Sequence, residues 1–578
     1  MPDRAGRARR LAVLLLPVAL VGLGLCLRAA AARAFTAFTL YRSPYTFEPS
    51  GQQPGPALTP RVAVVLIDGL GLASSRGLPF LDAQRARGAS FDTQIGLPSL
   101  SLPARAVMMT GAWQDVSGQA TNYHPHHIGV EHVFTLARGA GLPTAAAAGK
   151  NVQTLFAPAV ADAVVYAKEE DSDRFEVYEK AMQAAVQSSE ELLRRTPSGL
   201  LVLDLYLVDD AGHTWGASSP EYARAAARAD DALRRLAAQL DLGRDTLVVT
   251  ADHGHVAGGG HGGPEPDVMA VPLVLAGKGV RAGVSGSARQ VDVAPTLAVL
   301  LGLPLPAASQ GRPLLEALDA PEAVRLQALR NQVLQRRAFV RSLNTLLERV
   351  TEGAPEFPAT MGPASGPPSG DEAALGSELR LLDQAESMAR DRALARERPA
   401  RVRRALLLAA LPLVLLGAAV LLGVAPPREA GRAALFGLAA VAVYHALMRP
   451  LGLGYSLSLV NKDEWLEPFF RKDMILGVSC VAAAAIVLAL RARRRGAGLL
   501  ESSREAWLAA AVFCAGVLAE VAWTYVRADV FSRWMLADQA WGMSFYLHVL
   551  AVMAVGFCAP LFALPALLAR ALPARARA

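Results

Sequence analysis

Apolar stretches long enough to span a bilayer occur at the N-terminus and again in the last third of the chain. The first is residues 11–30; the others are 404–424, 433–449, 474–490, 506–526 and 543–569. Each approaches the ~20 residues that a helix needs to cross the hydrocarbon of a membrane. The pattern therefore predicts an N-terminal membrane anchor (1–30) and five C-terminal transmembrane helices (404–572). A signal peptide that is cleaved after the first stretch is the alternative for residues 1–30.

A different pattern fills residues 61–316, where short apolar runs alternate with helical stretches such as 221–241. The runs are "RVAVVLID" (61–68), "GLLVLDLYLV" (199–208), "DTLVVTAD" (245–252) and "VPLVLAG" (271–277). This alternation indicates an α/β domain, a mostly parallel sheet flanked by helices. Residues 31–60 would link it to the anchor. Residues 317–403 would hold an amphipathic helix (319–350), a Pro/Gly-rich linker (353–371) and a charged helix (372–400).

Arginines near the apolar stretches predict the orientation of the spans. The loops at 425–432 and 491–505 are rich in arginine, and the C-terminal tail adds Arg575 and Arg577. By the positive-inside rule, both termini face the cytoplasm and the α/β domain lies on the extracytoplasmic side of the cell membrane. Glu520 falls within the stretch 506–526, where ionisable groups are costly and often functional, unless it faces water near the outer end.

Composition narrows the class of protein. The chain of 578 residues is 52% hydrophobic and 6% aromatic, and its formal net charge is +7. The arginines flank apolar stretches and form no basic stripe with interleaved aromatics, so we expect no nucleic-acid partner. All four cysteines lie in apolar stretches, which leaves the α/β domain without a disulfide or a thiolate metal site.

Acids and histidines follow the ends of several predicted strands. Asp68 follows the first strand, and Asp209 and His213 follow "LLVLDLYLV". The stretch "TADHGHVAGGGHGG" (250–263) supplies the remaining three, Asp252, His253 and His261. Because such strand ends share one edge of a parallel sheet, we expect these side chains to converge. Six oxygen and nitrogen donors suit two neighbouring divalent metal ions, and the histidines favour zinc.

The stretch "GLPSLSLPARAVMMTG" (96–111) offers a nucleophile. Ser99 and Ser101 stand just before a predicted helix. A hydroxyl at a helix N-terminus beside a divalent ion can attack phosphorus. Either serine can instead cap the helix, and both readings can hold, one for each serine.

These motifs resemble the alkaline phosphatase superfamily, above all its type I phosphodiesterase/nucleotide pyrophosphatase branch. "LPSLSLP" matches the nucleophile pattern with Ser101 at the attacking position, and "DDAGH" (209–213) and "DHG" (252–254) match two ligand motifs. Further matches in spacing are Thr110, Gly111, Gly118 and Asn122. The resemblance implies that Ser101 forms a phospho-enzyme and that Asn122 binds a phosphoryl oxygen of the substrate. It assigns Asp68, Ser101, Asp252 and His253 to one metal, and Asp209, His213 and His261 to the other.

Two departures keep alternatives open. The nucleophile is a serine where the branch has threonine, which leaves monoester against diester preference undecided, and His255 replaces a usual methionine. The membrane layout also resembles the ethanolamine-phosphate transferases of glycolipid anchors. We therefore expect a membrane-anchored, two-metal phosphoric ester hydrolase, with a phosphoethanolamine-type transferase as the alternative. The phosphoester substrate is in either case a candidate membrane lipid.

Two other classes are less favoured. A sulfatase is disfavoured because "LPARA" (102–106) is only an echo of the Cys/Ser-x-Pro-x-Arg motif of that class. A non-catalytic membrane scaffold is least favoured, because it would need neither six ligands nor a nucleophile. The sequence carries no indication of oligomeric state.

Overall fold

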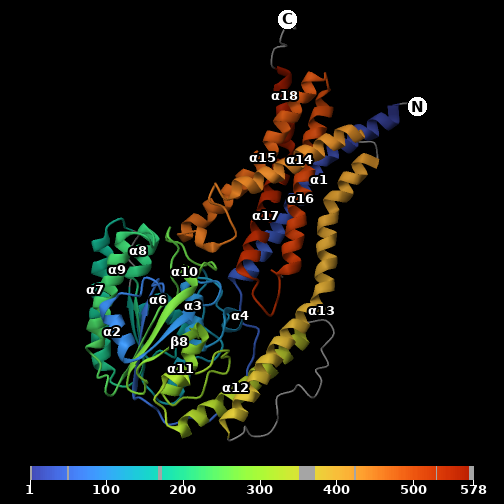
Figure 1. Cartoon of the computed structure of the whole chain (residues 1–578). Helices are drawn as coiled ribbons and strands as arrows, with labels where there is room; N and C mark the ends of the chain where they lie inside the picture. Colours follow the sequence, from blue (N-terminus) through green and yellow to red (C-terminus); the bar gives the residue numbers. More distant parts are fainter. Residues whose placement is uncertain are drawn as a thin grey trace. The chain divides into compact units, whose positions relative to one another are not determined.

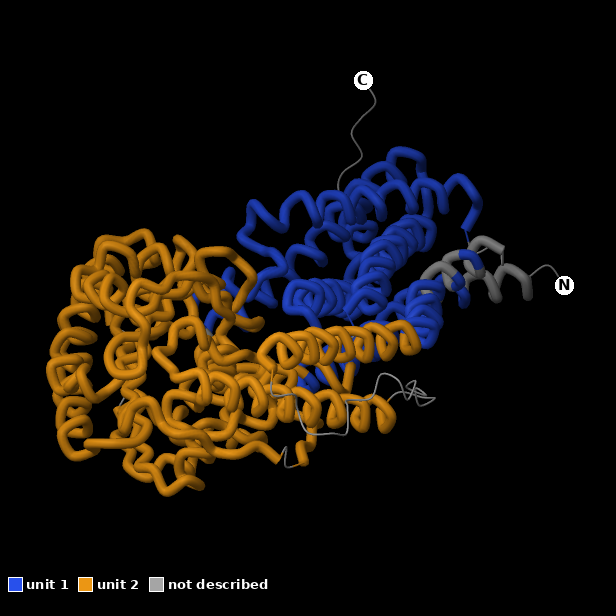
Figure 2. Tube along the Cα trace, turned by 60° about the horizontal axis from the view of Figure 1, so that its bottom comes forward, with its two compact units in different colours: residues 1–37, 398–531, 537–578 blue, residues 38–397, 532–536 orange. Residues whose placement is uncertain are grey.

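The chain forms two compact units in the computed structural model (Figures 1 and 2). The structure describes residues 3–48, 51–166, 172–350, 371–421, 425–528 and 530–571. Unit 1 holds residues 1–37, 398–531 and 537–578, and unit 2 holds residues 38–397 and 532–536. The predicted Pro/Gly-rich linker lies outside the described residues, except for Asp371.

An eight-stranded sheet forms the centre of unit 2, in the order β4-β3-β5-β1-β6-β7-β2-β8. All neighbouring strands pair in parallel except where β7 meets β6 and β2. This arrangement confirms the predicted mostly parallel α/β fold. The strands are β1 (Arg61–Ile67), β2 (Ala89–Gln94), β3 (Thr144–Gly149), β4 (Asp162–Tyr166), β5 (Gly199–Leu205), β6 (Thr246–Thr250), β7 (Ala270–Gly277) and β8 (Val284–Arg289).

Apolar cores cover both faces of the sheet. Alternate residues of a strand point to opposite faces, so Val64 and Leu66 of β1 enter one core while Val65 and Ile67 enter the other. Because both faces are covered, β1 is buried along its whole length. This explains why its sequence reads as a continuous apolar run rather than as an alternating one.

Helices supply the outer layers of unit 2. One core is closed by α2 (Pro79–Arg87), α7 (Phe175–Arg195), α8 (Leu207–Trp215) and α9 (Pro220–Ala237). The other is closed by α3 (Ser101–Thr110), α4 (Gln114–Ser117), α5 (Val133–Gly139), α6 (Lys150–Phe156), α11 (Val293–Leu300) and α12 (Glu322–Val350). The short α10 (Pro266–Met269) precedes β7.

The three central strands β5, β1 and β6 end at one level. Leu66 of β1 pairs with Asp204 of β5 on one side and with Thr250 of β6 on the other. The segments that follow these strands therefore start from the same edge of the sheet, which is the edge where open parallel sheets bind ligands.

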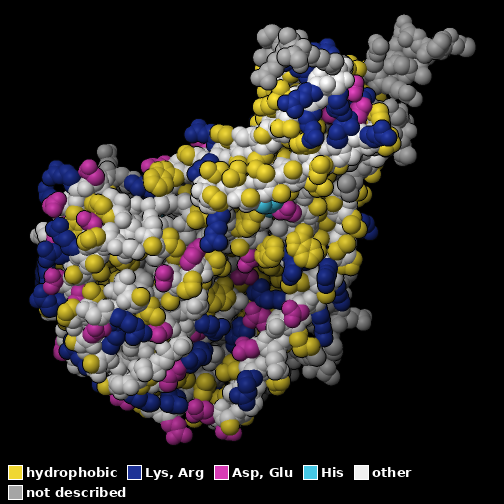
Figure 3. All heavy atoms as spheres, turned by 45° about the horizontal axis from the view of Figure 1, so that its top comes forward, with side chains coloured by type: hydrophobic (Ala, Val, Ile, Leu, Met, Phe, Trp, Pro, Cys, Tyr) yellow, Lys and Arg dark blue, Asp and Glu magenta, His cyan; other side chains and the backbone are white. Residues whose placement is uncertain are grey.

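Unit 1 is helical. Five of the described helices are long and apolar enough to cross a membrane, which indicates a multi-pass membrane protein. They begin with α1 (Asp3–Thr39) and continue with α14 (Pro427–Met448), α15 (Leu466–Arg494), α16 (Leu499–Arg527) and α17 (Gln539–Cys558), the last extended through η6 (Ala559–Ala563) and α18 (Leu564–Ala571). Hydrophobic side chains cover much of these helices in the face drawn in Figure 3. The orientation inferred from arginine stays a prediction.

Two elements are longer than the sequence pattern predicted. α1 continues through residues 31–39, which were expected to be linker. α13 (Glu372–Leu421) joins the predicted charged helix to most of the predicted span 404–424, and residues 422–424 of that span lie outside the described residues. The helix continues through residues 398–404 although Pro399 lies within this stretch.

A buried aspartate of α9 caps α2, and its loss should destabilise unit 2. Asp230 accepts hydrogen bonds from the backbone N–H groups of Phe80 (2.8 Å) and Leu81 (2.9 Å). Such first-turn N–H groups have no partner within the helix. Asp230→Ala should lower the free energy of unfolding by about 2–4 kcal/mol. Calorimetry of the purified full-length protein should show a lower unfolding midpoint.

The neighbouring Asp231 provides the matched control. It is exposed and pairs with Arg234 at 3.0 Å on the surface of α9. Asp231→Ala should cost less than about 1 kcal/mol, since exposed ion pairs contribute little. Equal losses for the two variants would show that the cap does not hold α2.

Candidate functional site

The first group of predicted ligands meets at the ends of β1 and β6. Asp68 follows β1 directly, and Asp252 and His253 follow β6; all three are buried. His253 Nε2 lies 3.6 Å from Asp68 Oδ1 and 3.7 Å from Asp252 Oδ2. Three donor atoms, one from each residue, lie within 4.8 Å of one another, close enough to share one ion.

The second group lies between α8 and the glycine-rich loop. Asp209 and His213 are four residues apart in α8, so they share one face of that helix, and His213 Nε2 lies 3.4 Å from Asp209 Oδ1. The loop brings His261 to within 3.2 Å of His213, measured between their Nε2 atoms. The structure thus brings all six predicted ligands to one edge of the sheet. Their assignment to metals remains a prediction.

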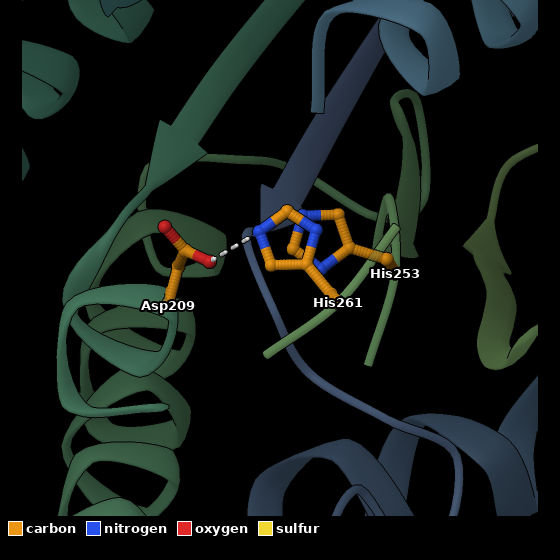
Figure 4. A group of neighbouring side chains, drawn as sticks. All are labelled: Asp209, His253 and His261. Atoms are coloured by element: carbon orange, nitrogen blue, oxygen red, sulfur yellow. Dashed lines mark ion pairs between the residues drawn. The ribbon is translucent and has the colours of Figure 1, made fainter. Parts of the chain in front are cut away.

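His253 adjoins both groups. Its ring stacks on that of His261, with centroids 3.7 Å apart (Figure 4). Donor atoms of Asp209, His253 and His261 also lie within 4.8 Å of one another. The resemblance placed His213, not His253, with Asp209 and His261. In the structure, donor atoms of both His213 and His253 lie within 4.8 Å of a carboxylate oxygen of Asp209.

The two stacked histidines present the same nitrogen to the site. Nδ1 of His261 donates to the Ser99 carbonyl oxygen (3.0 Å), and Nδ1 of His253 to that of Gly254 (3.2 Å). Each Nε2 therefore keeps a lone pair, the arrangement that metal-binding imidazoles adopt. Burial lowers the pKa of His253 to about 4 and holds the pKa of His261 well below its usual value, so both rings are neutral.

The carboxylates show that the site fits a cation. Asp68 Oδ1 is buried and has no hydrogen-bond partner in the part of the chain that the structure describes, and Asp252 Oδ2 is buried with the Arg105 guanidinium 3.1 Å away. A buried carboxylate oxygen that is left without a partner is costly. Divalent ions with nitrogen and oxygen ligands would satisfy these atoms together with the neutral imidazoles.

Arg105 is a site residue that the ligand motifs did not identify. It lies one turn after Ser101 in α3, and its guanidinium contacts three buried carboxylates: Asp68 (2.6 Å), Asp252 (3.1 Å) and Asp204 (3.2 Å). Burial acts to lower the pKa of Arg105, but these carboxylates hold it well above its usual value. Arg105 thus holds one oxygen of each acid in the first group.

The sequence contains a motif that could have identified Arg105. Counted from Ser101, the chain reads Ser-Leu-Pro-Ala-Arg, which has the Ser-x-Pro-x-Arg spacing. The prediction that this motif is absent was wrong. It was based on "LPARA" (102–106), which starts one residue after the serine of the motif. The sequence around Ser101 therefore gives no argument against a sulfatase.

His255, noted only as a departure from the family pattern, is also in the site. It is buried, its Nε2 lies 3.0 Å from Asp209 Oδ1, and its Nδ1 bonds to the Gly259 carbonyl oxygen. A Cβ atom at Gly212 would stand 2.7 Å from the ring, so only glycine leaves room for it. His255 therefore contacts the same Asp209 oxygen that faces His213 and His261.

The two serines differ in surroundings. Ser99 is buried and its Oγ donates to the Gly263 carbonyl oxygen at 2.8 Å. Ser101 is the first residue of α3, and its Oγ lies 3.1 Å from His253 Nε2. Neither serine caps α3 with its side chain, since Leu100 occupies the N-cap position. Only the Ser101 hydroxyl faces the metal-ligand groups.

Asn122 lies beside Ser101. Its Oδ1 accepts a hydrogen bond from the Leu102 backbone N–H at 3.0 Å. With Oδ1 used in this way, the amide NH₂ is the end of the side chain that can donate to a ligand. The predicted substrate-binding residue is therefore held next to the predicted nucleophile.

The chain resembles known phosphoryl-transfer proteins over the α/β domain. Residues 62–261 match the family described as type I phosphodiesterase / nucleotide pyrophosphatase. This match confirms the resemblance inferred from the motifs. It covers the sheet strands β1 to β6 and reaches His261, the last of the predicted ligands.

Curated relatives share the same region. GPI ethanolamine phosphate transferase 1 of Aspergillus fumigatus is 28% identical over 278 residues, 41% of this chain and 27% of the relative. The catalytic subunit of human GPI ethanolamine phosphate transferase 2 is 25% identical over 293 residues, 46% and 29% of the two chains. The chain thus spans less than a third of these relatives. Among solved structures, alkaline phosphatase PafA matches 46% of this chain with 12% identity and a TM-score of 0.38.

Removing Asp209 should lower the metal content of the protein. Asp209→Ala deletes the carboxylate that contacts His213 and His255, and should reduce tightly bound divalent metal by roughly one equivalent per chain. Elemental analysis after gel filtration measures the change. The adjacent Asp210, half-buried in the same helix, is the control, and Asp210→Ala should keep the full content. Unchanged metal in Asp209→Ala would remove this residue from the ligand set.

Proposed function

We propose that the chain is a membrane-embedded enzyme that transfers the phosphoryl group of a phosphoric ester, with Ser101 as nucleophile and two divalent metal ions, of which zinc suits the ligands best. One observation supports it above the others. The Ser101 hydroxyl stands at the start of α3, 3.1 Å from His253 Nε2, where two groups of buried acids and histidines meet.

The chain's own residues suit the first step. Ser101 Oγ attacks phosphorus, an Oγ–P bond forms, and the bond from phosphorus to the leaving oxygen breaks. The metal ions, when bound, would favour the ionised serine and neutralise charge on the phosphoryl oxygens. The N-terminus of α3 adds backbone N–H groups and the positive end of the helix dipole at the same place. The Asn122 amide would donate to one phosphoryl oxygen.

The second step decides between the two forms of the proposal. An oxygen nucleophile attacks the phosphoserine, and the Oγ–P bond breaks to regenerate Ser101. If the nucleophile is water, the enzyme is a hydrolase. If it is an acceptor hydroxyl, the enzyme is a transferase. The likeness to GPI ethanolamine phosphate transferases supports the transferase, which is the second candidate. The family match supports a phosphodiesterase, and the two lines of support are equally strong.

The products distinguish these forms. The full-length protein is assayed in ¹⁸O-labelled water in two arms. The first arm uses vesicles that contain phosphatidylethanolamine, and the second uses a chromogenic phosphodiester. Label in the released phosphate product identifies the hydrolase. A phosphoethanolamine adduct on a lipid or sugar hydroxyl, without label, identifies the transferase. A chromogenic sulfate ester forms the third arm, and turnover of that ester alone would overturn the proposal.

Ser101→Ala should lower turnover on the order of 10³-fold or more, because the attacking oxygen is removed. Metal content should remain near that of the wild type. Ser99→Ala removes only the hydrogen bond to Gly263, so it should cost stability of about 1 kcal/mol and little activity. Steady-state kinetics with unfolding midpoints measure both effects. The reverse ranking in kinetics would make Ser99 the nucleophile.

Asn122→Ala should lower kcat roughly 10²–10³-fold, as expected for the loss of one donor to a phosphoryl oxygen. Metal content and the unfolding midpoint should change little. Asn151, an exposed asparagine of α6, is the control. Asn151→Ala should keep the wild-type rate. An unchanged kcat in Asn122→Ala would remove this residue from the substrate site.

A further inference from the structure

A second convergence of histidines and an acid lies within the helices of unit 1. His445 belongs to α14, Glu520 to α16 and His548 to α17. One donor atom from each residue lies within 4.8 Å of the others. His445 Nε2 is 2.9 Å from Glu520 Oε1, and His548 Nε2 is 3.7 Å from Glu520 Oε2. The motifs of the α/β domain have no part in this cluster.

The contacts in the cluster are short enough for the three side chains to share one ion. His445 Nε2 is buried and lies 2.9 Å from Glu520 Oε1, a separation that a hydrogen bond from a protonated ring also gives. Two ligands at about 2.0–2.1 Å from a tetrahedral zinc ion stand about 3.3 Å apart. The separations of 2.9 and 3.7 Å bracket this value. A cation between the three side chains would bind the carboxylate and the lone pairs of the two neutral imidazoles together.

The charge of the cluster also favours a cation. Among the described residues, the ion pairs of Glu520 are with His445 and His548, with no lysine or arginine. A second carboxylate, Asp473 of α15, is fully buried next to it and accepts a hydrogen bond from Tyr444 at 2.6 Å. Carboxylates among apolar transmembrane helices are costly unless they are compensated. A divalent ion provides that compensation.

A fourth side chain completes the surroundings. The Tyr455 hydroxyl, from the segment after α14, lies 3.1 Å from His548 Nε2. It is close enough to the cluster to supply a fourth ligand, or to hydrogen-bond to one, if an ion were bound. Two histidines and one glutamate with an open fourth position form a donor set that zinc accepts in proteins.

We propose that His445, Glu520 and His548 bind one divalent transition-metal ion of the zinc class inside unit 1, additional to any metal held by unit 2. The ion links α14, α16 and α17, three helices far apart in sequence. This proposal does not depend on the proposed enzymatic function. The competing state is a metal-free network in which protonated His445 pairs with Glu520.

Cobalt(II) provides the test, because its visible absorption reports coordination. The full-length protein in detergent, with Asp209→Ala and Asp252→Ala to weaken metal binding by unit 2, should still bind one equivalent of Co²⁺ with a tetrahedral spectrum. X-ray absorption should give nitrogen and oxygen ligands at about 2.0–2.1 Å. In this background, His445→Ala and His548→Ala should each weaken Co²⁺ binding by about 100-fold or more. His445→Cys should retain binding and add a sulfur-to-cobalt charge-transfer band.

Thr524→Val is the matched control. Thr524 lies one turn beyond Glu520 in α16, and its hydroxyl bonds only to the Val521 carbonyl oxygen within the same helix. This variant should bind Co²⁺ as the background protein does. Tetrahedral Co²⁺ binding that is absent from the background protein, or that persists unchanged when His445 and His548 are both alanine, would overturn the proposal.

Folding is checked independently of metal. Each variant is used only if it elutes as the background protein does in size-exclusion chromatography. If the alanine variants fail this check, the charge-transfer band of His445→Cys decides, because a band that the background protein with its four native cysteines lacks arises when residue 445 is a ligand. A folded His445→Cys protein that binds Co²⁺ without this band overturns the proposal.

Discussion

Buried negative charge at one edge of the sheet is the constraint on which the site depends. Asp68, Asp204 and Asp252 are all buried there, and one guanidinium, that of Arg105, contacts all three. Burial, together with the nearby charge of Asp68, raises the pKa of Asp204 even though Arg105 acts to lower it, so the site disfavours ionised carboxylates. One arginine cannot neutralise three acids, so the remaining charge calls for cations. The same helix that carries Arg105 begins with Ser101, so charge balance and nucleophile are held by one element.

The positions of the six ligands could be predicted because they depend on local sequence and on one topological rule. Strands are visible as apolar runs, and acids at their carboxyl ends meet at one edge when the strands are parallel. Arg105 and His255 depend on tertiary packing instead. Arg105 reaches its acids from a helix, and His255 reaches Asp209 only because Gly212 lacks a side chain. Periodicity also missed the continuity of α13, because a change from charged to apolar residues resembles a boundary even where the helix continues.

The ionisable groups of the two units lie in different environments. In unit 2, the buried carboxylates of the first group lie next to an arginine and to neutral imidazoles, at the edge of a sheet. In unit 1, the described ion pairs of the half-exposed Glu520 are with histidines, on helices that are largely apolar. Histidine suits both groups because its charge can change. A neutral ring binds a metal ion, and a protonated ring pairs with an acid. Repeated convergence of acid and histidine is therefore what the two groups have in common.

The similarity to known proteins informs only one of these environments. The family match ends at residue 261, and the helices α14 to α18 of unit 1 lie wholly beyond it. The names of the relatives therefore bear on the chemistry of the sheet edge, and they leave the role of the membrane helices open. A single helix would anchor the α/β domain, yet this chain maintains a buried acid, Asp473, and a half-exposed one, Glu520, within its helices. Since each such group costs free energy in an apolar bundle, their presence argues that unit 1 binds something, and the donor atoms there point to a metal ion.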